Sequence, residues 1–416
     1  MNARWIFMDM NSYFASVEQQ ERPRLRGRPI IIAPVQSDTT CAIAASYEAK
    51  ALGIKTGTSV REARFICPSV EVVEARPTLY REYHERIVEI LNGLFATVKP
   101  LSVDEMACRL SPFQYGDAGE LTIARELKKR LRGRLGAEMR ASVGLAPNIF
   151  LAKTASEMQK PDGLTLLNEN NMPGALYGLK LRDLPGIGVN MERRLLAHGI
   201  NSMEKLYAAS PRELRRAWGS VVGERWWFML RGHQTLDYGA MELDVPKTVG
   251  HSHVLPPEFR SERGAEDILL RLGAKALKRV RSHDLAASQL EVTVQYRHEK
   301  TFESRRRVIP SGKRQHAADD VTWLHAMRPM LAQALKPIPS WKPFAVGLVF
   351  SGLLPTKDVN LSLFDNLPAK QRLSETVDKL NARFGHVVDL AGVYHLYESS
   401  PYRIPFGNPS RINVEA

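Results

Sequence analysis

Three acidic residues placed beside apolar segments constrain this chain more than any other feature. The run from Trp5 to Met8 is uninterrupted and apolar, which is typical of a buried strand, and Asp9 follows it directly. Asp104 and Glu105 follow the short apolar segment from Leu101 to Val103. Because adjacent residues of a strand point to opposite faces, the last two carboxylates can serve one site only where the strand bends or ends.

Nothing nearby in the sequence neutralises these carboxylates, and clustered carboxylates repel one another unless a cation holds them. Mg²⁺ prefers hard oxygen ligands, and proteins usually bind it through one or two carboxylates together with substrate phosphates. The pattern therefore predicts phosphoryl-transfer chemistry. The alternative is a structural role, with Asp9 in a turn or helix cap and Asp104 and Glu105 as an ordinary acidic pair; taken alone, these residues favour it.

The charge balance favours a polyanionic partner. Lys and Arg number 58 against 45 Asp and Glu, a net charge of +13, although this does not distinguish DNA from RNA. We expect no membrane contact, because no apolar stretch reaches roughly 18 residues and the N-terminus lacks a signal-peptide pattern. Cys41, Cys67 and Cys108 lack any metal-ligand spacing, so a reducing, cytoplasmic location is expected.

A chain of 416 residues should divide into several compact units. The patterns predict an α+β unit over 1–163 with an insertion at about 20–77, a helical unit over 164–232, a polar linker over 233–243, a second α+β unit over 244–355 and a tail over 356–416. Asn11 or Ser12 is expected to cap a helix that begins at Tyr13. In the tail, one more helix is predicted to end at Gly385. Its apolar face would comprise Leu373, Val377, Leu380 and Phe384.

Several motifs, taken in order, resemble those of the Y-family translesion DNA polymerases, near the bacterial polymerase IV branch. The resembling segments are Met8–Glu18, Ala45–Ile54, Leu101–Glu105, Ser142–Asn148, Phe150–Lys153, Lys160–Gly163 and Leu184–Gly188. The resemblance implies a multidomain right-hand polymerase with an α+β palm, small fingers, a helical thumb and an α+β little finger domain. It also implies a distributive, low-fidelity enzyme that copies past damaged template bases. Its partners would be primer–template DNA and deoxynucleoside triphosphates, and it would act as a monomer in the bacterial cytosol, at the nucleoid.

The same resemblance assigns the metal ligands. Asp9 and Asp104 would bridge two Mg²⁺ ions, for which Mn²⁺ could substitute. Glu105 would bind the catalytic ion, and the Met10 carbonyl would be a backbone ligand. Asn11 stands where polymerase IV commonly has Asp, a position that is not a core metal ligand in the family.

Nucleotide-binding positions are implied in the palm and fingers. Contacts to the triphosphate would come from Tyr47, Lys50 and Lys160 and from the helix start at Ser12, Tyr13 and Phe14. Lys50 replaces a more usual Arg and so gives up a planar fork while keeping the charge. Phe14 would be the steric gate that excludes a 2′-hydroxyl. Taken singly, each Lys could be a solvated surface charge and Phe14 a core residue.

DNA and clamp contacts are implied farther along the chain. Gly186 and Gly188 would let backbone amides approach a DNA phosphate, and the clusters Arg305-Arg306-Arg307 and Lys313-Arg314 would follow the duplex backbone. Leu361, Leu363 and Phe364 resemble a peptide that grips the sliding clamp, with Asn360 in place of the usual Gln. The alternatives are an ordinary helix turn, solvated basic faces and an apolar turn packed on the little finger.

Two other functions compete with this interpretation. A non-catalytic Y-family relative would act as a DNA- and clamp-binding scaffold, and such relatives characteristically lose the metal carboxylates. A nucleotide cyclase on a related palm would share paired carboxylates, but it would not need a thumb or a basic C-terminal domain. The sequence retains all three acidic residues and so favours the polymerase.

Overall fold

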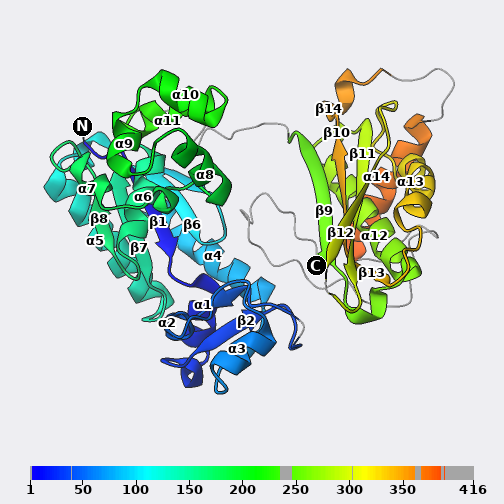
Figure 1. The fold of residues 1–416 in the computed structure, drawn as a ribbon, viewed down its shortest axis with the longest axis horizontal. Helices are drawn as coiled ribbons and strands as arrows, with labels where there is room; N and C mark the ends of the chain where they lie inside the picture. Colours follow the sequence, from blue (N-terminus) through cyan, green and yellow to red (C-terminus); the bar gives the residue numbers. More distant parts are fainter. Residues whose placement is uncertain are drawn as a thin grey trace. The chain divides into compact units, whose positions relative to one another are not determined.

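The computed structural model describes residues 2–38, 40–234, 246–301, 303–360, 367–385 and 388. They form two compact units that meet in sequence near residue 242 (Figure 1). Within those ranges no helix combines the length and the apolar character needed to cross a membrane.

A five-stranded sheet forms the centre of the first unit. Its order is β5 (Thr97–Pro100), β6 (Glu105–Arg109), β1 (Trp5–Met10), β7 (Ala141–Ala146) and β8 (Leu164–Leu166). Strand β1 is antiparallel to both β6 and β7, and all six of its residues are buried. The apolar run before Asp9 is therefore the middle strand of this sheet, which we call the palm sheet.

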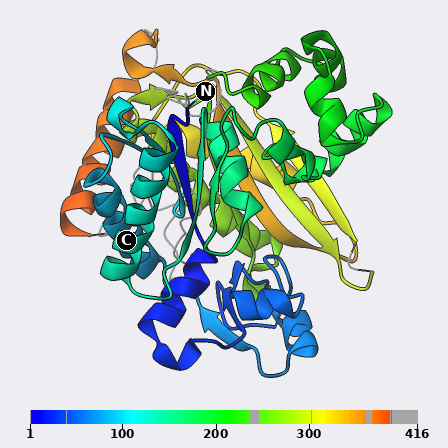
Figure 2. The same cartoon turned by 90° about the vertical axis from the view of Figure 1, so that its left-hand side faces the viewer.

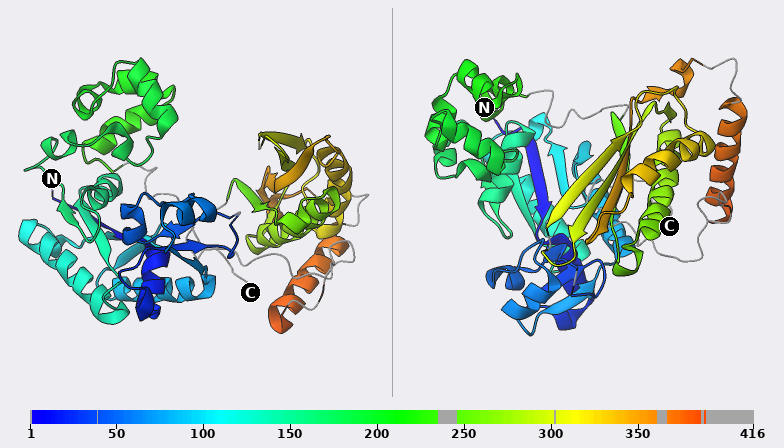
Figure 3. Two further views of the ribbon diagram at one scale, coloured as in Figure 1. Left: turned by 60° about the horizontal axis from the view of Figure 1, so that its bottom comes forward. Right: turned by 45° about the vertical axis from the view of Figure 1, so that its right-hand side comes forward.

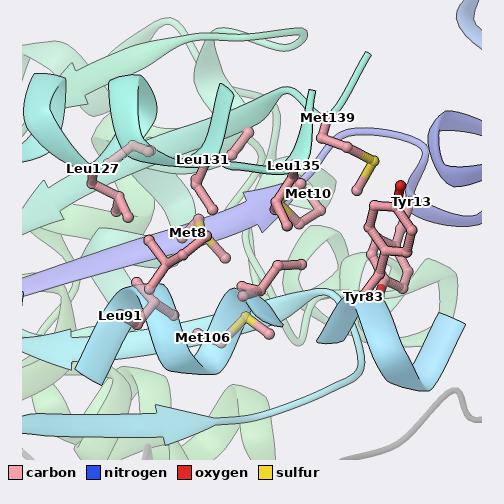
Figure 4. Packing of buried hydrophobic residues seen from close by; sticks show 14 of the residues in the cluster. Met8, Met10, Tyr13, Tyr83, Leu91, Met106, Leu127, Leu131, Leu135 and Met139 are labelled. Carbon is pink, nitrogen blue, oxygen red and sulfur yellow. The ribbon is translucent and has the colours of Figure 1, made fainter. Parts of the chain in front are cut away.

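Helices cover both faces of the palm sheet (Figure 2). On one face, Met8 and Met10 pack between α4 (Pro77–Asn92) and α5 (Asp117–Leu135), as Figure 4 shows. On the other face, Phe7 packs against α6 (Ile149–Met158). Because side chains alternate along a strand, Asp9 shares the α6 face with Phe7.

The fingers are an insertion with a small sheet and core of their own. After α1 (Tyr13–Glu21) and η1 (Pro23–Leu25) come β2 (Ile30–Ala33), β3 (Ala44–Ala45), α2 (Tyr47–Ala51), α3 (Val60–Ile66) and β4 (Glu71–Glu74). Strand β2 pairs with β3 and β4, and Ile31 and Val60 lie in the local core. These elements fall inside the insertion predicted at about 20–77.

A helical region follows the palm sheet. Its elements are α7 (Gly174–Tyr177), η3 (Leu181–Asp183), α8 (Val189–Ala197), α9 (Met203–Ala208), α10 (Pro211–Trp218) and α11 (Val222–Leu230). Its core is continuous with α6, where the Phe150 and Trp226 rings meet edge to face at 5.0 Å. Strand β8 pairs with β7, so the palm sheet extends slightly beyond the boundary predicted at residue 163.

The second unit is a four-stranded antiparallel sheet with helices on one face. The strand order is β12 (Ser304–Pro310), β11 (Gln289–His298), β13 (Trp341–Ser351) and β9 (Thr248–Val254). Helices α12 (Glu262–Ser282) and α13 (Asp320–Ala334) pack on that face (Figure 3). The short elements η2 (Pro112–Gln114) in the first unit and η4 (Pro257–Phe259), β10 (Leu285–Ala286), β14 (Leu354–Pro355) and η5 (Thr356–Asp358) in the second complete the set before residue 360.

Helix α14 (Leu367–Phe384) lies beside α13 and ends at Gly385, whose φ of 78° is in the left-handed region. This is where the sequence places its last helix, but the expected apolar face is not the one that packs. Leu373, Leu380 and Phe384 are 51%, 38% and 58% exposed. Val377 is half-buried, and polar side chains also join the helix to the rest of the unit, with the Ser374 hydroxyl accepting from the Asp320 N–H.

Candidate active site

Asp9 lies at the end of the middle palm strand, where it is 7% exposed. It pairs in register with Glu105 on β6 and with Ser142 on β7. Directly opposed residues of antiparallel strands point to the same face, so Asp9 and Glu105 face α6 together. The sheet thus brings together two carboxylates that are far apart in the sequence.

Asp104 lies at the bend that precedes β6. The Ser102 hydroxyl donates to its carboxylate and accepts from the Glu105 N–H at 2.9 Å. The Asp104 carbonyl accepts from the Met10 N–H at 3.0 Å, which ties the bend to the end of β1. The strand therefore starts at Glu105, which is the geometry under which neighbouring carboxylates can serve one site.

A third carboxylate comes from α6. Carboxylate oxygens of Asp9, Glu105 and Glu157 all lie within 4.8 Å of one another. Glu157 is not among the site residues predicted from the sequence. The available signal was its place one turn after Lys153 on the helix that directly follows β7.

Helix α6 approaches the sheet closely because β7 carries Gly144. A Cβ at this position would lie 2.1 Å from the Ala152 carbonyl oxygen and 2.4 Å from the Ser156 nitrogen, so any side chain would push α6 away. Asn148 caps the helix by accepting from the Leu151 N–H at 2.8 Å. This packing sets the distance between the strand carboxylates and the α6 side chains.

Two lysines neutralise the cluster, and both lie far from Asp9 in the sequence. The Lys160 ammonium is 2.8 Å from Asp9 Oδ2 and 2.8 Å from Glu157 Oε1. The Lys153 ammonium donates to both Glu105 oxygens at 2.7 Å. The expectation that no neighbour neutralises the carboxylates holds along the sequence and is wrong in space.

Burial has the largest effect on the pKa values of Asp9 and Asp104. It raises the pKa of Asp9 to about 7, although Lys160 partly opposes the shift. Burial likewise raises the pKa of Asp104. For Lys160, burial alone would lower the pKa, but Asp9 and Glu157 outweigh it and the pKa is raised. A buried carboxylate that resists ionisation is one that an added cation would stabilise strongly.

These residues fit a divalent cation bound through oxygen. The converging ligand atoms are carboxylate oxygens, which Mg²⁺ and Mn²⁺ prefer. Asp104, at the bend before β6, is not one of the three residues whose oxygens converge, but it lies close enough for Lys160 to act on its pKa.

The fingers bring polar side chains to the same place. The Lys50 ammonium donates to the Ser12 hydroxyl at 2.7 Å and lies 4.7 Å from the centre of the Tyr47 ring. Burial, and then Lys160, lowers the pKa of Lys50. Burial raises the pKa of Tyr47, on which Lys160 and Asp9 also act. Two ammonium groups close enough to repel each other suit a polyanionic ligand.

The start of α1 differs from the sequence expectation. Ser12 precedes the helix with φ 48° and ψ 45°, and its side chain makes no capping bond. The Asn11 side chain bonds instead to Ser142 and Asp162, so neither candidate caps the helix. The Tyr13 hydroxyl donates to the Tyr80 carbonyl at 2.6 Å and is directed into the core.

Phe14 is 5% exposed and stacks on Tyr80, with ring centres 4.4 Å apart and an angle of 22° between planes. It lies in the palm core together with Val17. The ring is therefore held rigidly, two residues from the hydroxyl that Lys50 contacts.

The predicted DNA-contacting residues fall into two groups. Gly186 has φ 99°, which requires glycine, and Gly188 is extended directly before α8. On β12, Arg306 is opposite Gln295 and exposed. Arg305 and Arg307 alternate to the other face, where the Arg305 guanidinium lies 4.6 Å from the centre of the Trp341 ring.

Arg307 also has a structural role. Its guanidinium donates to the carbonyls of Ala334 and Lys336 at the end of α13. Lys313 and Arg314 lie exposed in the segment after β12. The clamp-motif residues Leu361, Leu363 and Phe364 lie outside the described residues.

Three family models match the chain. The impB/mucB/samB family model covers residues 8–157 and its C-terminal domain model residues 246–363. A model described as the thumb domain of DNA polymerase-iota covers residues 182–234.

Two curated relatives that match the chain over most of its length are both named DNA polymerase IV. The chain is 35% identical over 406 residues to DNA polymerase IV of Moorella thermoacetica, covering 95% of this chain and 98% of that relative. It is 32% identical over 386 residues to DNA polymerase IV of Pelotomaculum thermopropionicum, covering 91% and 92% of the two chains.

Solved structures share the fold. The Y-family DNA polymerase chimera Dbh-Dpo4(243-245)-Dbh superposes with a TM-score of 0.67 at 21% identity, over 84% of this chain and 99% of that one. An insertion ternary complex of Dbh DNA polymerase superposes with a TM-score of 0.53 at 21% identity, over 83% and 98%.

Proposed function

The chain belongs to the impB/mucB/samB family and is a Y-family DNA-directed DNA polymerase, and we propose that Asp9, Asp104 and Glu105 carry its nucleotidyl transfer. DNA and deoxynucleoside triphosphates are its partners. The observation that carries the assignment is the convergence of Asp9 and Glu105 with Glu157 of α6 at one end of the palm sheet, within reach of Lys160. Asp104 joins the assignment through its place at the bend that the Met10 N–H holds against the end of β1.

We infer a two-metal reaction in which Asp9 and Asp104 would supply ligands to both ions, and Glu105 and the Met10 carbonyl would complete the protein ligands. The oxygen-only ligand set supports Mg²⁺, with Mn²⁺ as a substitute. When bound, such ions lower the pKa of the primer 3′-hydroxyl and stabilise charge on the triphosphate and the departing pyrophosphate. The palm contributes the rigid placement of the carboxylates and a largely water-excluded strand end.

The triphosphate would be bound by Lys160, Lys50 and Tyr47, and by the backbone at Ser12 and Tyr13. Support comes from two neighbouring ammonium groups beside a phenol and from the helix start at residue 13. When a metal ion binds the Asp9 carboxylate, the Lys160 ammonium would be released from it and could bind the triphosphate. Phe14, held flat by Tyr80, would exclude a 2′-hydroxyl.

DNA would be held by the backbone at Gly186 and Gly188 and by Arg305, Arg306, Lys313 and Arg314, through phosphates rather than bases. Of the three arginines on β12, Arg307 is the least available to DNA, because its guanidinium is bonded to carbonyls at the end of α13. We propose low fidelity and distributive copying past damaged bases, since small fingers enclose little of the template. The polymerase would act as a monomer in the cytosol.

A sliding clamp would be gripped by Leu361, Leu363 and Phe364. The support is the sequence pattern alone, since the pattern lies outside the described residues. A peptide of residues 357–367 should bind the clamp, and a peptide with these three residues replaced by Ala should not. Equal binding by both peptides, or stimulation of extension by the clamp after the same replacement in the whole chain, would contradict the assignment.

Primer extension by the purified protein tests the central assignment. Asp104→Ala and Glu105→Ala should each abolish extension while DNA binding, followed by fluorescence anisotropy, persists. Glu126→Ala is the matched control, because Glu126 is an exposed carboxylate on α5 that pairs with Arg130. Extension retained in either site variant would remove that residue from the chemistry, and a parent that binds DNA without extending it would restore the scaffold alternative.

A further inference from the structure

Asn11 lies two residues after Asp9 yet bonds to none of the site carboxylates. It is 2% exposed. Its Nδ2 donates to Ser142 Oγ at 2.9 Å, and its Oδ1 accepts from the Asp162 N–H at 2.7 Å. One side chain therefore joins the end of β1 to β7 and to the loop that follows α6.

Ser142 holds the same loop at two further points. This residue is fully buried. Its hydroxyl accepts from the Gly163 N–H at 3.3 Å and donates toward the Gln159 carbonyl at 3.5 Å. Asn11 and Ser142 together bond to residues 159, 162 and 163, so they fix both ends of the loop 159–163.

Lys160 is the charged residue that this loop presents to the palm site. Its ammonium reaches Asp9 and Glu157, each at 2.8 Å. On the outer side, Asp162 is held by Lys128 at 2.9 Å and by Arg132 at 3.1 Å. Asp162 itself has φ 56°, a backbone conformation that requires firm support from its surroundings.

We propose that Asn11 and Ser142 are positioning residues that aim Lys160 at the incoming triphosphate. The proposal rests on the proposed function, because it takes Lys160 to be a triphosphate ligand. An amide suits position 11 because it donates to the Ser142 hydroxyl and accepts from the Asp162 N–H at once, and a carboxylate could replace it only if the hydroxyl turned to donate to that carboxylate. A hydrocarbon side chain there would leave two buried polar groups without their partner.

Single-nucleotide insertion kinetics test this, with KM for the deoxynucleotide as the readout. Asn11→Ala should raise KM about tenfold, the effect of one or two lost hydrogen bonds on the placement of the ammonium. Ser142→Ala should also raise KM. This substitution removes only one oxygen atom, so the fold should be preserved. Neither substitution should raise KM further in a Lys160→Ala background, because its effect passes through Lys160.

The conservative variant and a matched control complete the design. Asn11→Asp keeps an acceptor for the Asp162 N–H and can receive the Ser142 hydroxyl, so KM should stay within about threefold of the parent. Asn168→Ala makes the same change at another buried asparagine, whose Oδ1 accepts from the Asn170 N–H away from the site, and should leave KM unchanged.

Three results would overturn the proposal, and they differ from one another. An unchanged KM in Asn11→Ala, or an equal rise in the parent and Lys160→Ala backgrounds, would show that Asn11 does not act through Lys160. An unchanged KM in Lys160→Ala itself would instead remove the lysine from triphosphate binding, and with it the premise taken from the proposed function.

Discussion

The palm and the second unit each bury aspartates beside a cation, and they hold that cation differently. In the second unit the Arg281 side chain is 7% exposed. Its Nε and Nη2 atoms donate to the two carboxylate oxygens of Asp378 at 2.6 and 3.1 Å, and Nη2 also lies 3.0 Å from Asp320 Oδ2. In the palm, Lys160 comes from a loop, is 25% exposed and is shared by two carboxylates.

The difference separates a permanent ion pair from an exchangeable one. A guanidinium bonded through several N–H groups has no ready substitute, so the Arg281 cluster fastens α14 to α12 and α13. An ammonium is a point charge that a metal ion can replace at a carboxylate and that a phosphate can attract away. Burial raises the pKa of both Asp9 and Asp320, so burial alone does not distinguish the two roles.

The largest expected effect is the loss of activity in Asp9→Asn. Extension should fall by about a thousandfold or more, because ion binding supplies several kcal/mol of transition-state stabilisation. The free energy of unfolding of the first unit should not fall by more than about 1 kcal/mol, since the neutral amide avoids the cost of burying a charge. Steady-state extension and urea unfolding measure the two quantities.

Asp320→Asn is the matched change in the second unit and should show the reverse pattern. Its unfolding free energy should fall by roughly 2–3 kcal/mol, because part of the charge on Arg281 is left unpaired. At saturating DNA, kcat should stay near that of the parent. If Asp9→Asn extended primers normally, or if Asp320→Asn abolished chemistry, the distinction between exchangeable and permanent pairs would fail.

Replacing Arg281 or Lys160 by methionine should give the next largest difference, which is in the free energy of unfolding of the two units. Arg281→Met leaves the buried Asp320 and the half-buried Asp378 without the guanidinium, so the second unit should lose roughly 3 kcal/mol of unfolding free energy at neutral pH. The loss should shrink as pH falls, because protonated carboxylates no longer need the cation. Lys160→Met should cost the first unit less than about 1 kcal/mol. Equal costs in urea unfolding would contradict the comparison.

Most of the fold could be predicted from sequence patterns that are local. The apolar run before Asp9 is β1, and the alternation from Leu290 to Tyr296 is the half-buried β11. Helical periodicity over residues 265–280 and around 321–335 predicts two helices, and α12 and α13 begin and end within three residues of these ranges. The family and the α+β multidomain architecture inferred from the motifs are confirmed by the family models and relatives.

Only the site residues that lie at the ends of strands could be predicted from local sequence patterns. Asp9 and Glu105 follow from strand ends, whereas the contacts of Lys153 and Glu157 depend on how closely α6 approaches β7. That distance is set by the lack of a side chain at Gly144. Nothing in the local sequence pattern indicates that a helix packs against this glycine. The same limit applies to Arg307, because a run of basic residues on a strand gives no sign of which member will meet a helix end.

Within the palm, replacing an aromatic residue should have a smaller effect on activity than replacing a carboxylate. Phe14→Ala should lower the preference for deoxynucleotides over ribonucleotides by roughly tenfold or more, because a cavity replaces the flat ring on Tyr80. Phe95→Ala is the matched control in the palm core. Both should lose stability of about 3 kcal/mol. If competition between the two nucleotides shows unchanged selectivity in Phe14→Ala, the gate assignment is wrong.

The smallest expected effect comes from giving the fingers a guanidinium, the group that holds the ion pairs of the second unit. Lys50→Arg would place a fork beside Ser12, where the present ammonium makes one bond of 2.7 Å. KM for the deoxynucleotide should fall about threefold, because a guanidinium can bind two phosphate oxygens in parallel. Lys342→Arg is the control, since Lys342 pairs with the exposed Glu299 on the second unit. A KM that rises, or that changes equally in both variants, would mean that Lys50 does not orient the phosphates and that the ammonium at this position serves only to balance charge.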